Sequence, residues 1–227
     1  EPRRPDTPFW VERGSVEGDR LRLSPEESHH LLHVHRAAAG APFQAIDGNG
    51  VLYDCVLDSV EGCAAVGRIV RRSEEVGELR LWIHLLVGMP DWGAVEAVVA
   101  NAVPLGARLL DFVVCERSGR GPLGAERLDR LRRLAQAGLK QSRRTRLTEI
   151  RSSASLEPVL ASLPSGPRYV ADPDGKPWHP LRGESIQEVV TLAVGPPGGF
   201  SDRERETLRL AGFLSISLGP NRLSTEI

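Results

Sequence analysis

The spacing of apolar residues divides the chain into two regions with different periods. Up to about residue 72 the apolar runs are short, and two of them, 42–47 and 51–57, flank the turn sequence Asp47-Gly48-Asn49-Gly50. This arrangement is typical of a β-hairpin, and 63–70 predicts another strand. From Leu79 onward strand-like runs alternate with helix-like segments. The second region therefore predicts an α/β fold with a parallel sheet.

Several of the strands of the second region are nearly continuous apolar runs, as expected where helices cover both faces of a sheet. In the first region Ser24, Pro25 and Glu27 predict a helix start with a capping box. The polar stretch 71–78 has no apolar period, so we predict a domain boundary between 1–72 and 73–227. In the second domain we predict strands at 79–87, 108–115, 168–171, 189–194 and 213–218, and helices near 92–103, 125–140, 153–162 and 201–211.

Composition narrows the functional classes only slightly. The chain has 227 residues, of which 41% are apolar, and this suffices for a sizeable core. The net charge of −1 gives no bulk attraction to nucleic acid, so such a partner must be recognised by local clusters. Three widely spaced cysteines without a Cys-x-x-Cys pair disfavour a disulfide framework or a zinc site. No apolar run approaches the ~18 residues of a membrane span and no apolar signal region is seen, which predicts a soluble cytoplasmic protein without a membrane partner.

Two loops rich in glycine and proline each follow an apolar, strand-like run. Parallel strands bring such loops to one edge of a sheet, so we expect the two loops to meet there and leave bare backbone facing a ligand. The alternative is a stiff turn in which Ser201 caps the next helix. A phosphate-binding P-loop is disfavoured, because Pro196 and Pro197 have no N–H group and no lysine follows. The loops are Gly195-Pro196-Pro197-Gly198-Gly199-Phe200-Ser201 and Leu218-Gly219-Pro220-Asn221-Arg222-Leu223-Ser224-Thr225-Glu226.

Two further clusters carry charge or titratable groups. Between Glu126 and Arg146 there are eight basic and two acidic side chains, a pattern that fits either a solvated helix face or, over 140–146, a clamp for phosphates. A group of four histidines lies in seven positions, and no nearby carboxylate or cysteine cluster completes a metal site. We therefore predict packing and phosphate contacts for them, and no metal. These histidines are His29, His30, His33 and His35.

The two loops resemble the cofactor loops of the RsmE family, SPOUT-class methyltransferases of 16S ribosomal RNA. The family pattern is approximately Gly-Pro-Glu-Gly-Gly-(Phe or Leu)-Ser and Leu-Gly-x-x-x-Leu-Arg-Thr-Glu-Thr. The resemblance spans nearly the whole chain, and Gln141 and Arg144 match a family Glu-Gln-x-x-Arg motif. The chain departs from the pattern at Pro197, where the family has glutamate, and at Ser224, where it has arginine. The family also continues past the position of Ile227 into a final helix, which this sequence lacks.

The resemblance implies a PUA-like RNA-binding β-barrel over 1–72, followed over 73–227 by a SPOUT α/β domain with a C-terminal trefoil knot. It further implies a homodimer that uses S-adenosylmethionine to methylate a uridine N3 in 16S ribosomal RNA of the small subunit. Glu226 and Arg222 are then the catalytic candidates. The implied RNA contacts are His30, Arg36, Lys140, Gln141, Arg143, Arg144 and Arg146. The implied cofactor contacts are Ala171, Val194, Gly195, Pro196, Gly198, Gly199, Leu218, Gly219, Pro220, Asn221, Leu223 and Thr225.

Two other functions stay open at this point. A non-catalytic RNA-binding protein of the same fold is favoured by Pro197, by Ser224 and by the shortened end. An α/β enzyme that acts on a small phosphorylated substrate is disfavoured by the basic 140–146 segment and by the lack of N–H donors in the proline loop. Binding of S-adenosylmethionine and methyl transfer to ribosomal subunits would separate the three functions.

Overall fold

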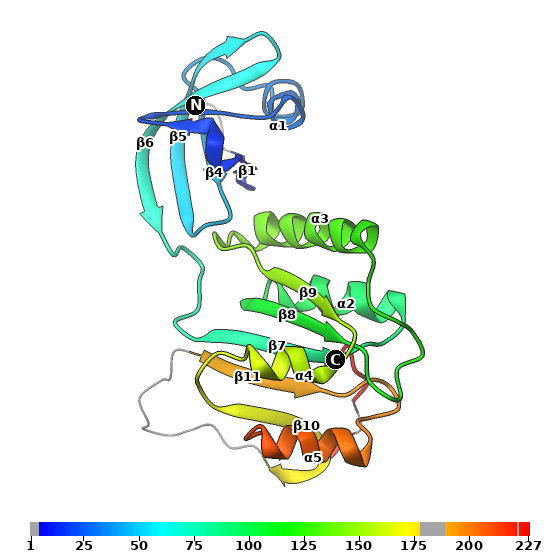
Figure 1. Ribbon diagram of the computed structural model, residues 1–227. Coiled ribbons are helices and arrows are strands. Elements are labelled where there is room, and N and C mark those ends of the chain that lie inside the picture. Colours follow the sequence, from blue (N-terminus) through cyan, green and yellow to red (C-terminus); the bar gives the residue numbers. More distant parts are fainter. Residues whose placement is uncertain (1–4, 178–188, 222) are drawn as a thin grey trace. The chain divides into compact units, whose positions relative to one another are not determined.

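The computed structural model describes residues 5–177, 189–221 and 223–227, which belong to two compact units. The first unit runs as far as Glu78 and includes Gln136–Leu147, a segment from much later in the chain. The second unit consists of Leu79–Ala135 and Thr148–Ile227. Each unit contains its own six-stranded sheet (Figure 1). The basic segment that the sequence singled out thus belongs to the first unit.

The first unit is a curled, mainly antiparallel sheet with short helical segments (Figure 1). Its strand order is β1-β4-β5-β6-β3-β2, and only β1 and β4 pair in parallel among the strands described. The elements are β1 (Phe9–Trp10), a 3-10 turn (Arg13–Ser15), β2 (Val16–Glu17), β3 (Arg20–Arg22), α1 (Pro25–His29), a π-helical turn (His30–Val34), β4 (Pro42–Ile46), β5 (Val51–Glu61) and β6 (Ala64–Glu74).

Local sequence signals account for the hairpin and the helix of this unit. The Asp47 carboxylate accepts the Asn49 N–H at 2.8 Å, which closes the turn between β4 and β5. The Ser24 hydroxyl accepts the Glu27 N–H at 3.2 Å, and Pro25 occupies the first helical position. The predicted hairpin and helix start are therefore confirmed. Strands β1, β2 and β3 are only two or three residues long, too short for an alternating pattern, and the sequence did not predict them.

The second unit is a parallel sheet with the order β12-β10-β11-β7-β8-β9, and its helices lie against the sheet (Figure 1). The α/β prediction is confirmed. The elements are β7 (Trp82–Gly88), α2 (Trp92–Ala102), β8 (Ala107–Val113), α3 (Ala125–Ser142), β9 (Glu149–Ser153), α4 (Leu156–Ala161), β10 (Arg168–Pro177), β11 (Val189–Val194), α5 (Asp202–Leu210) and β12 (Leu214–Ser217). The end of α3, from Gln136 onward, belongs to the first unit.

Three elements of the second unit, β9, α4 and β10, differ from the sequence prediction. Residues 149–153 form β9 at the edge of the sheet, and the following helix begins at Leu156 rather than near 153. The β9 sequence Glu-Ile-Arg-Ser-Ser is polar because an edge strand is covered less than a central one, so it lacked the apolar run that marks the other strands. Strand β10 extends to Pro177, and its pairing with β12 shifts register between Ala171 and Lys176.

One core cluster of the second unit joins residues of the sheet to residues of α4 and α5. Leu86, Ala193, Phe200, Leu208 and Phe213 are among its buried members. A polar group is buried in the same sheet: His84 Nε2 lies 2.9 Å from Asp111 Oδ2. Because β11, β7 and β8 are neighbours, their carboxyl ends share one edge, from which the glycine-rich loop after β11 departs. None of the helices described is long and apolar enough to cross a membrane.

Candidate functional site

The two glycine-rich loops lie against each other at the carboxyl edge of the parallel sheet. The first follows β11 and the second follows β12, and these strands flank β10 on either side. The Thr225 hydroxyl donates to the Gly195 carbonyl oxygen at 3.0 Å, across thirty positions of sequence. The structure therefore brings together Gly195 and Thr225, two of the residues that the sequence placed in a cofactor site.

The first loop is a tight turn with little room for side chains. The Gly199 N–H donates to the Pro196 carbonyl at 2.7 Å, and Gly199 has a φ of +70°, where glycine is favoured. A Cβ at Gly195 would lie 3.1 Å from the Phe200 nitrogen. Pro196 is buried, whereas Pro197 and Gly198 are exposed. Bare backbone is thus presented where the loop faces solvent, as a ligand site requires.

The same loop ends in a capped helix. The Ser201 hydroxyl accepts the Glu204 N–H at 3.2 Å, and a Glu204 carboxylate oxygen accepts the Ser201 N–H at 2.8 Å. This is a complete capping box at the start of α5. The stiff-turn interpretation of Ser201 is therefore correct for that residue. It is compatible with a ligand site, because the cap uses the far end of the loop and leaves 195–199 outside it.

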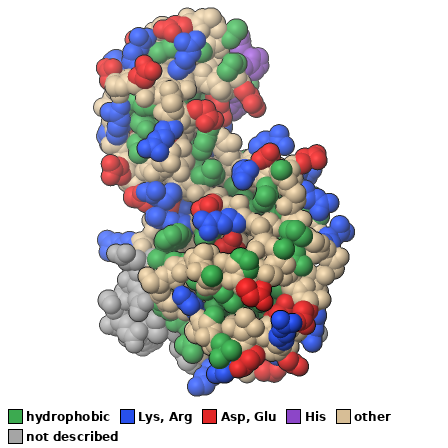
Figure 2. All heavy atoms as spheres, in the orientation of Figure 1, with side chains coloured by type: hydrophobic (Ala, Val, Ile, Leu, Met, Phe, Trp, Pro, Cys, Tyr) green, Lys and Arg blue, Asp and Glu red, His purple; other side chains and the backbone are tan. Residues whose placement is uncertain are grey.

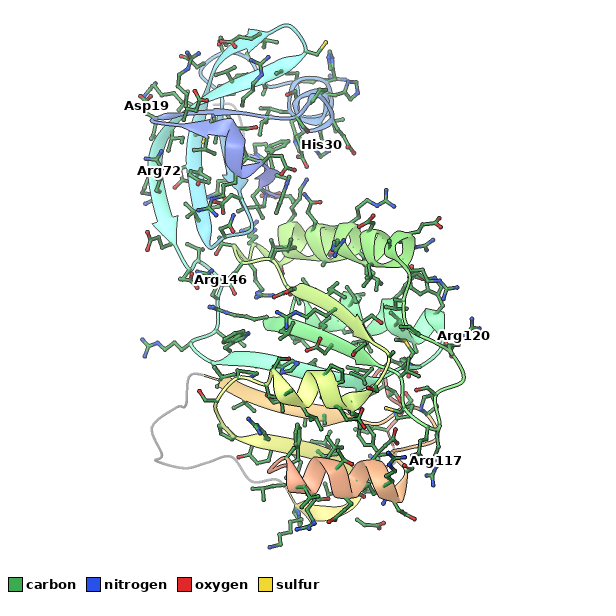
Figure 3. The ribbon with its side chains drawn as sticks, viewed as in Figure 1. Asp19, His30, Arg72, Arg117, Arg120 and Arg146 are labelled. Carbon is green, nitrogen blue, oxygen red and sulfur yellow. The ribbon has the colours of Figure 1, made fainter. Side chains whose placement is uncertain are left out.

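A third segment, Cys115 to Ser118 after β8, also contacts the first loop. Its Glu116 N–H donates to the second Glu204 oxygen at 2.8 Å. Arg117 Nη1 donates to the carbonyls of Gly198 at 3.1 Å and Phe200 at 3.4 Å. Figure 3 shows Arg117 on the loop between β8 and α3, beside the start of α5. Sequence reasoning missed this segment; the Ser-x-x-Glu spacing at Ser201 signalled the cap, but nothing local signalled Arg117.

The remaining expected cofactor residues lie on the same two loops or on β10 and β11. Ala171 and Val194 are half-buried in their strands, and Gly219, Pro220 and Asn221 are exposed. Leu218 and Leu223 are 50% and 46% exposed. Two apolar side chains are thus exposed on the loop that also contains the exposed backbone of Gly219. This combination suits a ligand with an apolar ring face and a polar edge, and S-adenosylmethionine has both.

The catalytic candidates can be placed only in part. Glu226 is half-buried and follows Thr225, and the Ile227 N–H donates to the Ser224 carbonyl at 3.1 Å in the turn that contains it. The contact from Thr225 to Gly195 therefore holds Glu226 close to the first loop. Arg222 lies outside the described residues, and its expected role stays a prediction.

Beside the capped helix lies a separate cavity of about 300 Å³. It lies between the ends of β8 and β9 and the starts of α4 and α5, and its lining includes Glu116, Ser155, Glu157, Arg203 and Glu204. Burial, together with the nearby Glu204 carboxylate, raises the pKa of Cys115 in its wall to about 12. Its charged lining residues are three glutamates and one arginine, and the two glycine-rich loops are not among its lining residues.

The expected RNA contacts of the 140–146 segment are mostly engaged within the first unit. Arg144 is 2% exposed and lies 2.7 Å from Glu78. The Thr145 and Arg146 N–H groups each donate to the other Glu78 oxygen at 2.9 Å. The structure thus gives Arg144 a place in the interior of the fold. Its prediction as an RNA contact is untested and finds no support in this burial.

Three further basic residues of the segment differ in exposure. Lys140 pairs with Glu27 at 2.5 Å and is 20% exposed, and Arg146 pairs with Glu75. Arg143 is 64% exposed, and its contact with Asp6 is 3.9 Å long. Gln141 is exposed. Arg143 and Gln141 are therefore the members of this segment that present most surface to an RNA.

The histidines of the first unit gather at one surface, where Figure 2 shows them together. The rings of His30 and His35 are 4.8 Å apart, and each meets the buried Phe9 edge-on at 5.8 Å. Burial and the neighbouring His30 lower the pKa of His35. Arg36 is exposed with a φ of +53°. Within the part of the chain that the structure describes, no three histidine, cysteine or acidic side chains are arranged to hold a metal ion.

Comparison with known proteins gives the family. A family model described as RNA methyltransferase domain matches residues 77–226. The ribosomal RNA small subunit methyltransferase E of Synechocystis is 24% identical over 88% of this chain, and the chain spans 66% of that protein's length. A methyltransferase from Legionella pneumophila, solved with bound S-adenosylmethionine, is 25% identical with a TM-score of 0.80, covering 97% of this chain and 92% of its own.

A second solved structure, an rRNA methyltransferase from Porphyromonas gingivalis, is 28% identical with a TM-score of 0.82 and covers 96% of this chain and 92% of its own. The matched region 77–226 contains Gly195 and Thr225, the residues whose contact defines the site. The chain therefore belongs to the RNA methyltransferase domain family, and its resemblance to the RsmE proteins within that family is confirmed.

Proposed function

We propose that the protein uses S-adenosylmethionine to methylate N3 of a uridine in 16S ribosomal RNA. The observation that carries this proposal is the contact between Thr225 and Gly195, which joins the two glycine-rich loops into one site at the sheet edge. The Legionella protein of the same fold is solved with this cofactor. The names of the matched relatives supply the ribosomal substrate, and the exposed leucines 218 and 223 supply an apolar surface.

When bound, S-adenosylmethionine supplies a methyl group that is already activated on a sulfonium. The chain then has to orient the reactants and accept one proton, because uracil N3 carries a hydrogen. That atom lies on the Watson–Crick edge, so the base must enter the site unpaired or flipped. The first loop and residues 218–225 would hold the cofactor. Glu226, fixed beside Thr225, would orient the uracil edge or accept its proton.

Several features of the fold support the rest of the proposal. The curled sheet of the first unit is consistent with a PUA-like RNA-binding barrel over 1–72. The order β12-β10-β11, in which the last strand returns beside β10, is consistent with a trefoil knot in a SPOUT domain over 73–227. A homodimer and a cytoplasmic location complete the proposal, with neither a metal nor a membrane as partner. They follow from the RsmE resemblance.

The test is transfer of radiolabelled methyl groups to small ribosomal subunits whose RNA lacks this modification. Nucleosides from the labelled RNA are then separated by chromatography and identified by mass. We expect labelled 3-methyluridine from these subunits. Subunits that already carry the modification should not be labelled. Binding of cofactor and RNA without methylation would instead indicate the non-catalytic RNA-binding protein. If the protein binds neither the cofactor nor the RNA, both the methyltransferase and the RNA-binding function are rejected. An enzyme that acts on a small phosphorylated substrate would then be the remaining candidate.

A further inference from the structure

We propose that Arg117 is a positioning residue for the first glycine-rich loop, and that the segment after β8 acts with Thr225 to preform the cofactor site. Arg117 lies on a loop far from both cofactor loops in sequence, 81 residues before Gly198. This inference rests on the proposed function, because it assigns the loop a role in binding S-adenosylmethionine.

The contacts of Arg117 are to the second half of the loop, at the exposed Gly198 and the buried Phe200. One nitrogen, Nη1, donates to the carbonyls of Gly198 at 3.1 Å and Phe200 at 3.4 Å. A Cβ at Gly198 would lie 3.1 Å from the Cβ of Arg117, so the stem of the arginine also lies against the glycine. Arg117 thus fixes the direction of the Gly198 carbonyl, adds a second donor to the Phe200 carbonyl that Arg205 Nε also contacts, and restricts the space above position 198.

The loop needs such external contacts because it has few of its own. Pro196 and Pro197 have no N–H groups to donate. The bond from Gly199 to the Pro196 carbonyl is the turn's own internal tie. Three glycines in five positions give the free loop many accessible conformations. A ligand that had to order the loop on binding would bind less tightly, and contacts made beforehand remove that cost.

Backbone contacts of the same segment make Arg117 a clean target for mutation. The Glu116 N–H donates to Glu204, and Glu204 in turn accepts the Ser201 N–H. These bonds do not use the Arg117 side chain. Truncation of Arg117 should therefore leave the α5 cap in place and release the Gly198 carbonyl. The Phe200 carbonyl keeps a second donor, because it also accepts Arg205 Nε at 3.2 Å.

Arg120 provides a matched control. It lies three residues further along the same loop, is exposed, and has the same charge as Arg117 (Figure 3). A general effect of removing positive charge from this loop would appear equally in Arg117→Ala and Arg120→Ala. An effect of the carbonyl contacts would appear in Arg117→Ala and not in Arg120→Ala. Arg117→Lys keeps a donor at a similar reach, so its properties should lie between those of Arg117→Ala and the parent protein.

The first measurement uses the protein without cofactor. Hydrogen–deuterium exchange of peptides that cover 195–204 should be at least threefold faster in Arg117→Ala than in the parent protein. The Arg120→Ala variant should match the parent, and Arg117→Lys should fall between the two. Equal exchange in all four proteins would overturn the positioning role.

The second measurement is calorimetric titration with S-adenosylmethionine. We expect Arg117→Ala to raise Kd at least tenfold, Arg117→Lys to raise it less, and Arg120→Ala to leave it unchanged. A parent protein that binds no S-adenosylmethionine would reject the proposed function, while the exchange experiment would still decide whether Arg117 orders the loop. Faster exchange in Arg117→Ala with an unchanged Kd would overturn the link to cofactor binding.

Discussion

The guanidinium of Arg144 lies 2.7 Å from the carboxylate of Glu78, and each side chain is only 2% exposed. The other Glu78 oxygen accepts the N–H groups of Thr145 and Arg146. One carboxylate thereby joins the polar stretch that precedes Leu79 to the segment that follows α3, within the first unit. The buried pair explains why residues 136–147 fold with a unit whose other members end at Glu78.

We predict that Arg144→Ala lowers the free energy of unfolding by about 3–5 kcal/mol, because it leaves the buried Glu78 carboxylate without its charged partner. Arg143→Ala is the control, since its side chain is 64% exposed and its loss should change stability by less than about 0.5 kcal/mol. Urea unfolding followed by circular dichroism measures both. Similar values for the two variants would show that the pair contributes no net stabilisation.

RNA binding by the same segment should depend on Arg143 rather than on Arg144. If the exposed guanidinium of Arg143 contacts one phosphate, Arg143→Ala should reduce the slope of log Kd against log salt concentration by about 0.7–0.9. Filter binding to a 16S ribosomal RNA fragment over a range of salt concentrations gives that slope. Arg209→Ala is the control, because Arg209 pairs with Glu206 on α5. An unchanged slope for Arg143→Ala would indicate that Arg143 contacts no phosphate and that its side chain is only solvated.

Parts of this structure could be predicted from the sequence wherever a local rule decides the outcome. Apolar runs marked the central parallel strands, and Ser24 with Pro25 marked the start of α1. Strand β9 was missed because an edge strand need not be apolar. Its pairing with β8 is set by the partner strand, at positions such as Leu110 beside Ile150.

The candidate site shows the same division. Glycines and prolines identified both loops, and the rule for parallel strands predicted their meeting, which Thr225 and Gly195 now show. The role of Glu78 in holding Arg144, and that of Arg117 in holding Gly198, could not be predicted. In each case the partners are more than sixty residues apart, and single charged residues carry no periodic signal. The number of basic residues over 126–146 predicted that they lie on the protein surface. One of them, Arg144, is instead buried in an ion pair with Glu78.

Gly88, the last residue of β7, should tolerate no side chain. A Cβ there would lie 2.4 Å from Cδ and 2.5 Å from the nitrogen of Pro196, and neither atom belongs to a flexible side chain. Gly88→Ala must therefore displace the first loop. We expect at least tenfold weaker binding of S-adenosylmethionine and a lower Tm. Gly119→Ala is the control, because a Cβ at Gly119 meets nothing within 4 Å. Equal cofactor affinity in the two variants would contradict this account of the site.

Two of the three cysteines should resist thiol reagents in the folded protein. Burial raises the pKa of Cys55 and of Cys115 from 9.0 to about 12, with added contributions from negative charges nearby. Cys63 is exposed. At pH 8 Ellman's reagent should titrate one thiol per chain rapidly, and three after denaturation. Fast reaction of two or three thiols in the native protein would contradict the buried positions.

The same groups predict a loss of stability at alkaline pH. An acid whose pKa is higher in the folded state than in the unfolded state holds its proton more tightly when folded. The stability it contributes is complete below pH 9 and declines as the pH rises towards 12. Tyr53, whose pKa burial and Asp47 raise to about 12, adds to this effect from about pH 10. The urea midpoint should therefore fall steadily above pH 9. Cys55→Ala with Cys115→Ala should make that fall shallower, and Cys63→Ala should not.

The departures from the RsmE pattern should limit the rate of methylation. Pro197 offers neither a carboxylate nor a backbone N–H. Under the proposed function, Ser224 removes a long cation from a site where negative charge would develop on uracil as N3 loses its proton. An interaction of charge that is specific to the transition state can contribute ~3–4 kcal/mol, roughly 10²–10³ in rate. Both positions are exposed, so their side chains can be replaced without disturbing the core.

We expect slow methylation by the parent protein, and at least a tenfold increase in turnover for Pro197→Glu combined with Ser224→Arg. Single-turnover assays on small subunits separate this effect from binding, and the control is Arg120→Glu, which adds an acid at an exposed position outside both glycine-rich loops. If the parent already methylates at an ordinary enzymatic rate, or if the double change leaves turnover unaltered, the acid and the cation of the family pattern are dispensable for this reaction.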